Sequence, residues 1–243
     1  FFVTYANIDK VSPTGHMFDN STPSNPLDAW LLSITQSLIE DVSKGLDTYD
    51  LSGAIDPIVK FIDELNNWYI RRSRRRFWKS ENDNDKAEAY EALYIALKTL
   101  AKVAAPIVPF ITEEMYQNLK SPEDKESVHL CSYPVANKEW KNEELEFKME
   151  TVQKAVSMGH SLRNQFNLKN RQPLSSVALV TRNPDEKKVL AEMEESIQNK
   201  VKAYNEKYQS LKPQYEEIMK RLGDQIGVIQ DLETRLPDSL DSK

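Results

Sequence analysis

The chain has 243 residues, of which 40% are hydrophobic and 29% are charged, and its formal net charge is −6. This balance is typical of a globular protein, and the negative net charge excludes a protein that coats nucleic acid indiscriminately. No apolar run approaches the roughly 20 residues that a membrane-spanning helix needs, so we expect a soluble protein.

Residues 1–24 contain a short apolar opening followed by loop-forming residues. The segment from Phe1 to Tyr5 has neither a starting methionine nor the basic region of a signal peptide, so we expect it to continue from a longer chain. Asn25 and Pro26 then predict the start of a helix, with Asn25 as its N-cap and Pro26 at the first helical position.

Four helices are predicted next, over residues 25–46, 52–78, 87–104 and 112–119. Apolar residues recur at steps of three and four, which predicts one buried stripe along a helix. Gly45 and the polar residues up to Asp50 are expected to end the first helix. Because the helices are joined by short loops, we expect a helical bundle over residues 25–142, of which residues 121–142 are a connector.

Residues 143–243 predict a helix followed by a small α/β domain and a tail. The helix runs from Glu143 to about Phe166, and the short apolar run from Val177 to Val180 predicts a strand. Residues 186–203 have a helical pattern, and the pattern weakens after Tyr204. The expected fold class is therefore mainly α, a helical bundle followed by a small α+β C-terminal part.

A basic segment, Asn67 to Lys79, ends the second predicted helix, and aromatic residues are interleaved with its cations. Two adjacent helical faces carry the cations, and guanidinium groups at this spacing suit the phosphate backbone of an RNA. The cations of the basic segment are Arg71, Arg72, Arg74, Arg75, Arg76 and Lys79.

The same segment also permits structural pairing inside the bundle. The apolar stripe of Phe61, Leu65 and Trp68 continues to Arg72, which would place Arg72 at the bundle interface beside a carboxylate. Trp68 and Trp78 are both expected to be core residues. We therefore expect Trp68 and Arg72 inside, and four cations facing the RNA: Arg71, Arg75, Arg76 and Lys79.

A second polar cluster covers residues 161–174, at the end of the fifth predicted helix. Asparagine and glutamine can read base edges and arginine can hold phosphates, but polar helix ends are common, and taken alone the cluster is better explained as a solvated surface turn. Its candidate contacts are Arg163, Asn164, Lys169 and Arg171.

The sequence predicts no self-contained active site. His16, His129 and His160 lie in different elements, and Gly-rich phosphate loops and Gly-x-Ser-x-Gly elbows are missing. Cys131 is the single cysteine, so neither an internal disulfide nor a structural zinc site is expected. No catalytic residue, metal ligand or cofactor is therefore predicted within this chain.

Taken together, these segments resemble the isoleucyl-tRNA synthetase family of class I aminoacyl-tRNA synthetases. The resemblance weakens from about residue 195, and the ATP-site signatures of that family, His-Ile-Gly-His and Lys-Met-Ser-Lys-Ser, do not occur. The second polar cluster is similar to the branch without a C-terminal zinc module. Five segments carry the resemblance in order: Phe1–Asp9, Asn25–Trp30, Asn67–Trp78, Ala104–Glu114 and Ser161–Leu174.

The resemblance implies that residues 1–24 lead in from a catalytic core, that residues 25–142 form an anticodon-binding bundle, and that the rest belongs to a small C-terminal domain. It implies binding to the anticodon stem-loop of isoleucine tRNA, through the candidate cations of both clusters. The full-length enzyme is expected to use ATP and Mg2+ and to be cytoplasmic and monomeric, with its catalytic domain upstream of this chain. The fragment alone is expected to be inactive.

Two other functions remain open at this point. A helical module whose basic segment docks on an acidic protein would have the same charges. A fragment with its own enzymatic activity is disfavoured, because both ATP-site signatures are missing.

Overall fold

The structure is a computed structural model that describes residues 1–19, 21–78, 83–168 and 179–192. Helices form the regular secondary structure in these ranges, and they contain no strand. The prediction of a mainly α fold is therefore confirmed. The chain divides into two compact units, Phe1–Gln153 and a second unit that begins at Lys154.

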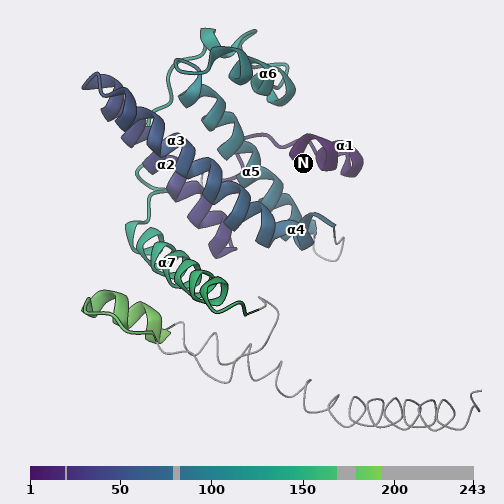
Figure 1. Ribbon diagram of the computed structural model, residues 1–243. Coiled ribbons are helices and arrows are strands. Elements are labelled where there is room, and N and C mark those ends of the chain that lie inside the picture. The colour runs from purple at the N-terminus through teal and green to yellow at the C-terminus, as the bar shows by residue number, and fades with distance from the viewer. Residues whose placement is uncertain (20, 79–82, 169–178, 193–243) are drawn as a thin grey trace, which may run out of the picture. The chain divides into compact units, whose positions relative to one another are not determined.

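Three long helical segments form the centre of the first unit (Figure 1). Helix α2 (Pro26–Asp47) packs on α3 (Leu51–Glu64) and on α5 (Asp83–Ala104). Helix α3 continues directly into a π-helix, η1 (Leu65–Ile70), and then into α4 (Arg71–Trp78), which also packs on α5. The single helix predicted over residues 52–78 is thus one long helix with a π-helical insertion.

Shorter elements surround this centre. Helix α1 (Phe2–Asp9), which the sequence did not predict, packs on α5, and α6 (Pro109–Leu119) packs on the other end of α5 with the 3-10 helix η2 (Val128–Leu130). Helix α7 (Glu143–Gln165) begins in the first unit, where its Glu146 carboxylate accepts hydrogen bonds from the Ser33 and Ser37 hydroxyls of α2.

Residues near the two ends of α2 show how the sequence determines where this helix begins and how it packs on α3. The Asn25 side chain accepts a hydrogen bond of 3.0 Å from the Leu27 N–H, so the predicted N-cap is confirmed. Gly45 does not end α2 but lies inside it, against the backbone of Ala54 in α3. A Cβ atom at Gly45 would lie 2.6 Å from the backbone nitrogen of Ala54, so only glycine permits this contact.

Aromatic rings fix α1 against α4 and α5. The Phe77 ring of α4 meets the Tyr90 ring of α5 edge-on, with centroids 4.9 Å apart, and Phe1 meets Phe77 in the same way at 5.3 Å. Phe2 lies 6.0 Å from both Tyr90 and Tyr94. These rings, which we call the aromatic cluster, hold three helices together at the end of α4.

The C-terminal predictions fall largely outside the described residues. Of the predicted strand, Leu179 and Val180 have no regular structure, and residues 177 and 178 are not described. Residues 184–192 are helical and overlap the helix predicted over residues 186–203. None of the helices in the described ranges is long and apolar enough to span a membrane.

Candidate nucleic-acid interface

The long helix that carries the basic segment buries one stripe of side chains. Phe61, Leu65, Tyr69, Ser73 and Phe77 are all at most 3% exposed, and each follows the one before by four residues. A step of four exceeds the roughly 3.6-residue turn of an α-helix, so such a stripe would drift around a regular helix by about 40° at each step. The wider turns of the π-helix compensate for this drift and keep the stripe on the core side.

The expectation that Arg72 lies inside the bundle is therefore wrong. The π-helix shifts the phase of the helix by one residue, and Ser73 takes the interior position instead. Arg72 is exposed, and its guanidinium carbon lies 5.2 Å from the centre of the Trp68 ring, in a cation–π contact. Trp68 itself is half-buried and packs against the core, as predicted.

Arg76 is the cation that turns inward, which corrects its predicted outward position. Its guanidinium donates to both Asp28 carboxylate oxygens at 2.7 Å, and its Nε donates to Asp85 Oδ2 at 2.9 Å. The side chain of Arg76 is 12% exposed, and that of Asp28 is fully buried. The Tyr69 hydroxyl completes this polar network by donating to Asp28 at 2.6 Å. The network joins α2, η1, α4 and α5.

Burial and charge within this network shift the ionisation of its members in consistent directions. Burial alone lowers the pKa of Arg76, but its hydrogen bonds to Asp28 and Asp85 outweigh burial and raise that pKa above its ordinary value. Burial, together with the nearby charge of Asp28, raises the pKa of Tyr69. The hydrogen bond from Arg76 lowers the pKa of Asp85. Arg76 is therefore charged and bound within the bundle.

The other arginines of α4 form an exposed surface that we call the cationic face: Arg71, Arg72, Arg74 and Arg75. None of them has a carboxylate partner among the residues that the structure describes. Trp78 is 56% exposed, so its predicted place in the core is wrong. Lys79, the last predicted cation of the basic segment, lies outside the described residues.

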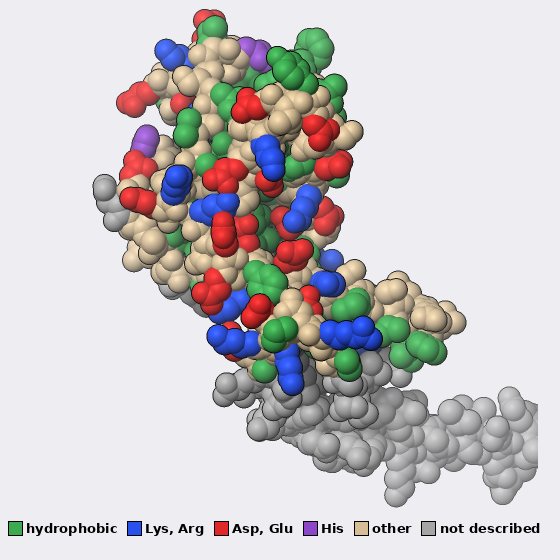
Figure 2. Space-filling view, turned by 90° about the vertical axis from the view of Figure 1, so that its left-hand side faces the viewer, with side chains coloured by type: hydrophobic (Ala, Val, Ile, Leu, Met, Phe, Trp, Pro, Cys, Tyr) green, Lys and Arg blue, Asp and Glu red, His purple; other side chains and the backbone are tan. Residues whose placement is uncertain are grey.

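A groove between α2 and α3, also lined by the first turns of α7, has a volume of about 520 Å³ but the wrong charge for RNA. Two lysines and five carboxylates line it: Lys60, Lys141, Asp41, Asp56, Glu64, Glu146 and Glu150. Burial, together with the neighbouring acidic groups, raises the pKa of Glu64. On the face drawn in Figure 2, acidic side chains are likewise numerous and interspersed with basic ones.

The second polar cluster is described only in part. Arg163 and Asn164 lie in the last turn of α7, where Arg163 is half-buried and Asn164 is exposed. The helix ends at Gln165, and Asn167 in the following turn has a positive φ of 53°, the left-handed conformation common after a helix C-terminus. Lys169 and Arg171 lie outside the described residues. Across the described ranges, no group of three or more His, Cys, Asp or Glu side chains is placed to hold a metal ion.

Residues 28–179 match the family described as the anticodon-binding domain of tRNA ligase. The chain belongs to this family. It is 59% identical over 207 residues to an isoleucine–tRNA ligase from Treponema denticola, and 51% identical to one from Treponema pallidum. A third isoleucine–tRNA ligase, from Dehalococcoides mccartyi, is 48% identical over 200 residues. The resemblance drawn from the sequence is therefore confirmed.

The matches cover 81% of this chain and only about a fifth of each of these ligases. The matched family segment begins at Asp28, the carboxylate that binds Arg76, and includes the whole of α3, η1 and α4. The cationic face and the polar network beneath it both lie within the anticodon-binding family region.

Proposed function

We propose that this chain is the part of an isoleucine–tRNA ligase that binds the anticodon stem-loop of isoleucine tRNA, and that the cationic face contacts its phosphates. The observation that carries the proposal is the exposure of four arginines on one eight-residue helix with no carboxylate partner in the described part of the chain. An arginine without a carboxylate partner keeps the donors of its guanidinium fork available for phosphate oxygens.

The charge distribution supports a local contact. The chain as a whole has a net charge of −6, which repels a polyanion at long range. Four adjacent cations on such a body direct RNA to one place, because charges are screened over about 8–10 Å at physiological salt. The groove between α2 and α3 carries an excess of carboxylates and is unsuited to the same partner.

The proposal extends to properties of the longer ligase to which the chain is similar. The catalytic domain upstream would use ATP and Mg2+ to attach isoleucine to the tRNA, in a cytoplasmic monomer, and this part of the chain would position the tRNA without making bonds. Residues 143–243 would supply the small α+β part. Further proposed tRNA contacts are Lys79, Arg163, Asn164, Lys169 and Arg171, while Arg76 would support the interface from within.

A salt series tests the phosphate contacts. Affinity for isoleucine tRNA is measured by filter binding in Arg74→Ala and Arg75→Ala variants of the intact natural protein. Each lost phosphate contact is expected to weaken binding and to reduce the slope of log affinity against log salt by about 0.7–0.9. The matched control is Lys44→Ala, which removes one exposed cation from the last turn of α2. An unchanged slope in both arginine variants contradicts the proposal.

The anticodon itself separates tRNA binding from docking on an acidic protein. Unlabelled tRNA with the isoleucine anticodon should displace labelled tRNA better than the same molecule with a changed anticodon. Equal competition by the two would favour a module that recognises negative charge in general, including an acidic protein surface.

A further inference from the structure

Trp78, the last residue of α4, is an exposed aromatic residue at the end of the cationic face. Arg71, Arg74, Arg75 and Trp78 follow one another at the spacing i, i+3, i+4 and i+7, so they lie on one side of α4. All four are exposed, Trp78 by 56% of its surface. Since the helix rises about 1.5 Å per residue, the indole lies only about 10 Å along the axis from Arg71.

The bundle keeps this indole outside for a structural reason. Phe77 occupies the interior position at the end of α4, where it is 1% exposed within the aromatic cluster. The next residue along a helix points about 100° away from it. Trp78 therefore cannot enter the core without displacing Phe77 from its contact with Tyr90.

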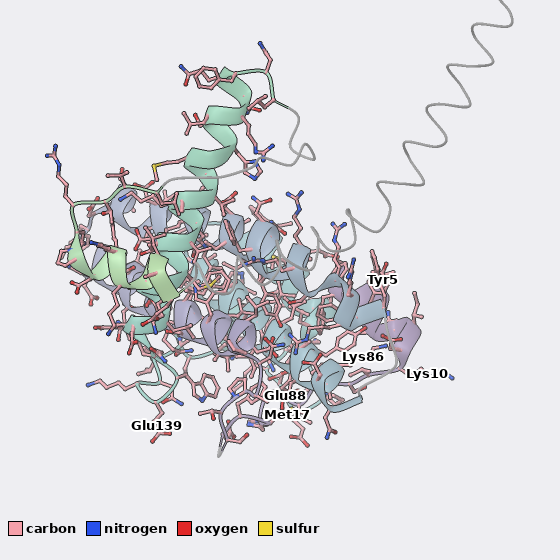
Figure 3. All side chains as sticks on the ribbon, turned by 90° about the horizontal axis from the view of Figure 1, so that it is seen from below. Tyr5, Lys10, Met17, Lys86, Glu88 and Glu139 are labelled. Atoms are coloured by element: carbon pink, nitrogen blue, oxygen red, sulfur yellow. The ribbon has the colours of Figure 1, made fainter. Side chains whose placement is uncertain are left out.

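A second aromatic ring flanks Trp78. The centre of the Tyr5 ring lies 6.4 Å from that of Trp78, and the two planes are inclined by 47°. Tyr5 belongs to α1, which the aromatic cluster holds in place, and it lies at the α1 edge of the first unit (Figure 3). Tyr5 thus supports one side of the Trp78 indole, while more than half of the Trp78 surface is open to a ligand.

We propose that Trp78, supported by Tyr5, is a stacking surface for one unpaired base of the bound tRNA. This inference rests on the proposed function and adds to it the residue that contacts a base. Proteins that bind unpaired RNA combine cations that follow the backbone with aromatic side chains on which bases stack. The cationic face supplies the first part and Trp78 the second, within reach of neighbouring nucleotides.

A fluorescent base tests the contact directly. The anticodon stem-loop carries 2-aminopurine at one unpaired position at a time, and the intact natural protein is added. Stacking on an indole quenches this fluorophore, so we expect quenching at one loop position with the unaltered protein. Trp78→Leu should abolish that quenching and weaken binding roughly 5- to 150-fold, the range found for loss of base–aromatic stacking. Trp78→Phe, which keeps an aromatic ring, should retain most of the affinity.

The salt slope distinguishes the two proposals. Trp78→Leu removes no charge, so the slope of log affinity against log salt should not change, whereas Arg74→Ala should lower it. If the unaltered protein binds the stem-loop with an arginine-dependent slope while Trp78→Leu binds equally well, the stacking inference is overturned and the proposed function stands. If the arginine variants also bind unchanged, both are overturned.

A measurement on the unaltered protein guards against a variant that fails to fold. An abasic nucleotide placed at the quenched position should weaken binding as much as Trp78→Leu does, and the two changes combined should weaken it no further. If no abasic position weakens binding by the unaltered protein, the inference is refuted without reference to any variant.

Discussion

Replacing Arg76 by alanine is expected to destabilise the bundle, although Arg76 belongs to the same run of arginines as the cationic face. In the folded chain its guanidinium makes two hydrogen bonds of 2.7 Å to Asp28 and two of 2.9 Å to Asp85, one to the carboxylate and one to the backbone carbonyl. The variant would leave the Tyr69 hydroxyl as the one described side-chain donor to the fully buried Asp28 carboxylate.

The size of the effect follows from that burial. Removing one partner of a buried ion pair costs about 3–5 kcal/mol, because the remaining charge is left uncompensated. The contribution from Asp85 is smaller, since its side chain is 31% exposed and solvent screens it. We therefore expect Arg76→Ala to lower the free energy of unfolding by about 3–5 kcal/mol, a large part of the roughly 5–15 kcal/mol that stabilises a typical domain.

Urea denaturation followed by circular dichroism measures this change, and Arg75→Ala is the matched control. The neighbouring arginine is exposed and lacks an ion-pair partner in the described part of the chain, so its replacement should change stability by at most about 0.5 kcal/mol. Equal stability of the two variants would refute the assignment of Arg76 to the polar network.

Three further predictions concern the first unit. Gly45→Ala should destabilise it by about 1–3 kcal/mol, because the added methyl group meets the Ala54 backbone and α2 must move away from α3; thermal unfolding measures the loss, and an unchanged melting temperature contradicts it. Glu64→Gln should stabilise the first unit at pH 7, because burial raises the pKa of Glu64 and so makes its charged form destabilising in the folded state. The gain in stability should disappear as the pH falls through that raised pKa. A variant that is less stable than the natural protein at pH 7 would disprove this. Asp9→Asn should destabilise the first unit at neutral pH, because the hydrogen bond from Lys86 lowers the pKa of Asp9. The difference in stability between the natural protein and the variant should be full above the ordinary aspartate pKa of about 4 and should shrink below it. A difference in stability that is independent of pH from 2 to 7 would count against the ion pair.

The helices were predictable because their apolar residues repeat regularly and their caps are local. Asn25 and Pro26 identify the start of α2 from two adjacent residues, without any tertiary information. Helix α1 was not predicted, because its eight residues are stabilised by ring contacts with α4 and α5 rather than by a pattern of their own.

The sequence did not correctly predict which arginines lie inside the bundle and which lie on its surface. A regular helix of 3.6 residues per turn that buries Phe61 would also bury Arg72. The residues of Leu65–Ile70 carry no sequence pattern that predicts a π-helix. That one local change of winding places Ser73, and not Arg72, at the interior position, and Arg76 is the arginine that reaches the buried carboxylate. The spacing of Arg71, Arg74, Arg75 and Trp78 in the sequence places them on one side of a helix. Only the structure shows that this side of α4 faces outward.

The polar network beneath α4 also has a consequence for binding. The last turn of a helix ordinarily frays, and a ligand that contacts it must bear the entropy of ordering it. Here Arg76 joins that turn to Asp28 near the start of α2 and to Asp85 in α5, so folding itself has already ordered the backbone that displays the exposed side chains. An arginine that touches no phosphate can thereby raise the affinity for RNA through pre-organisation alone.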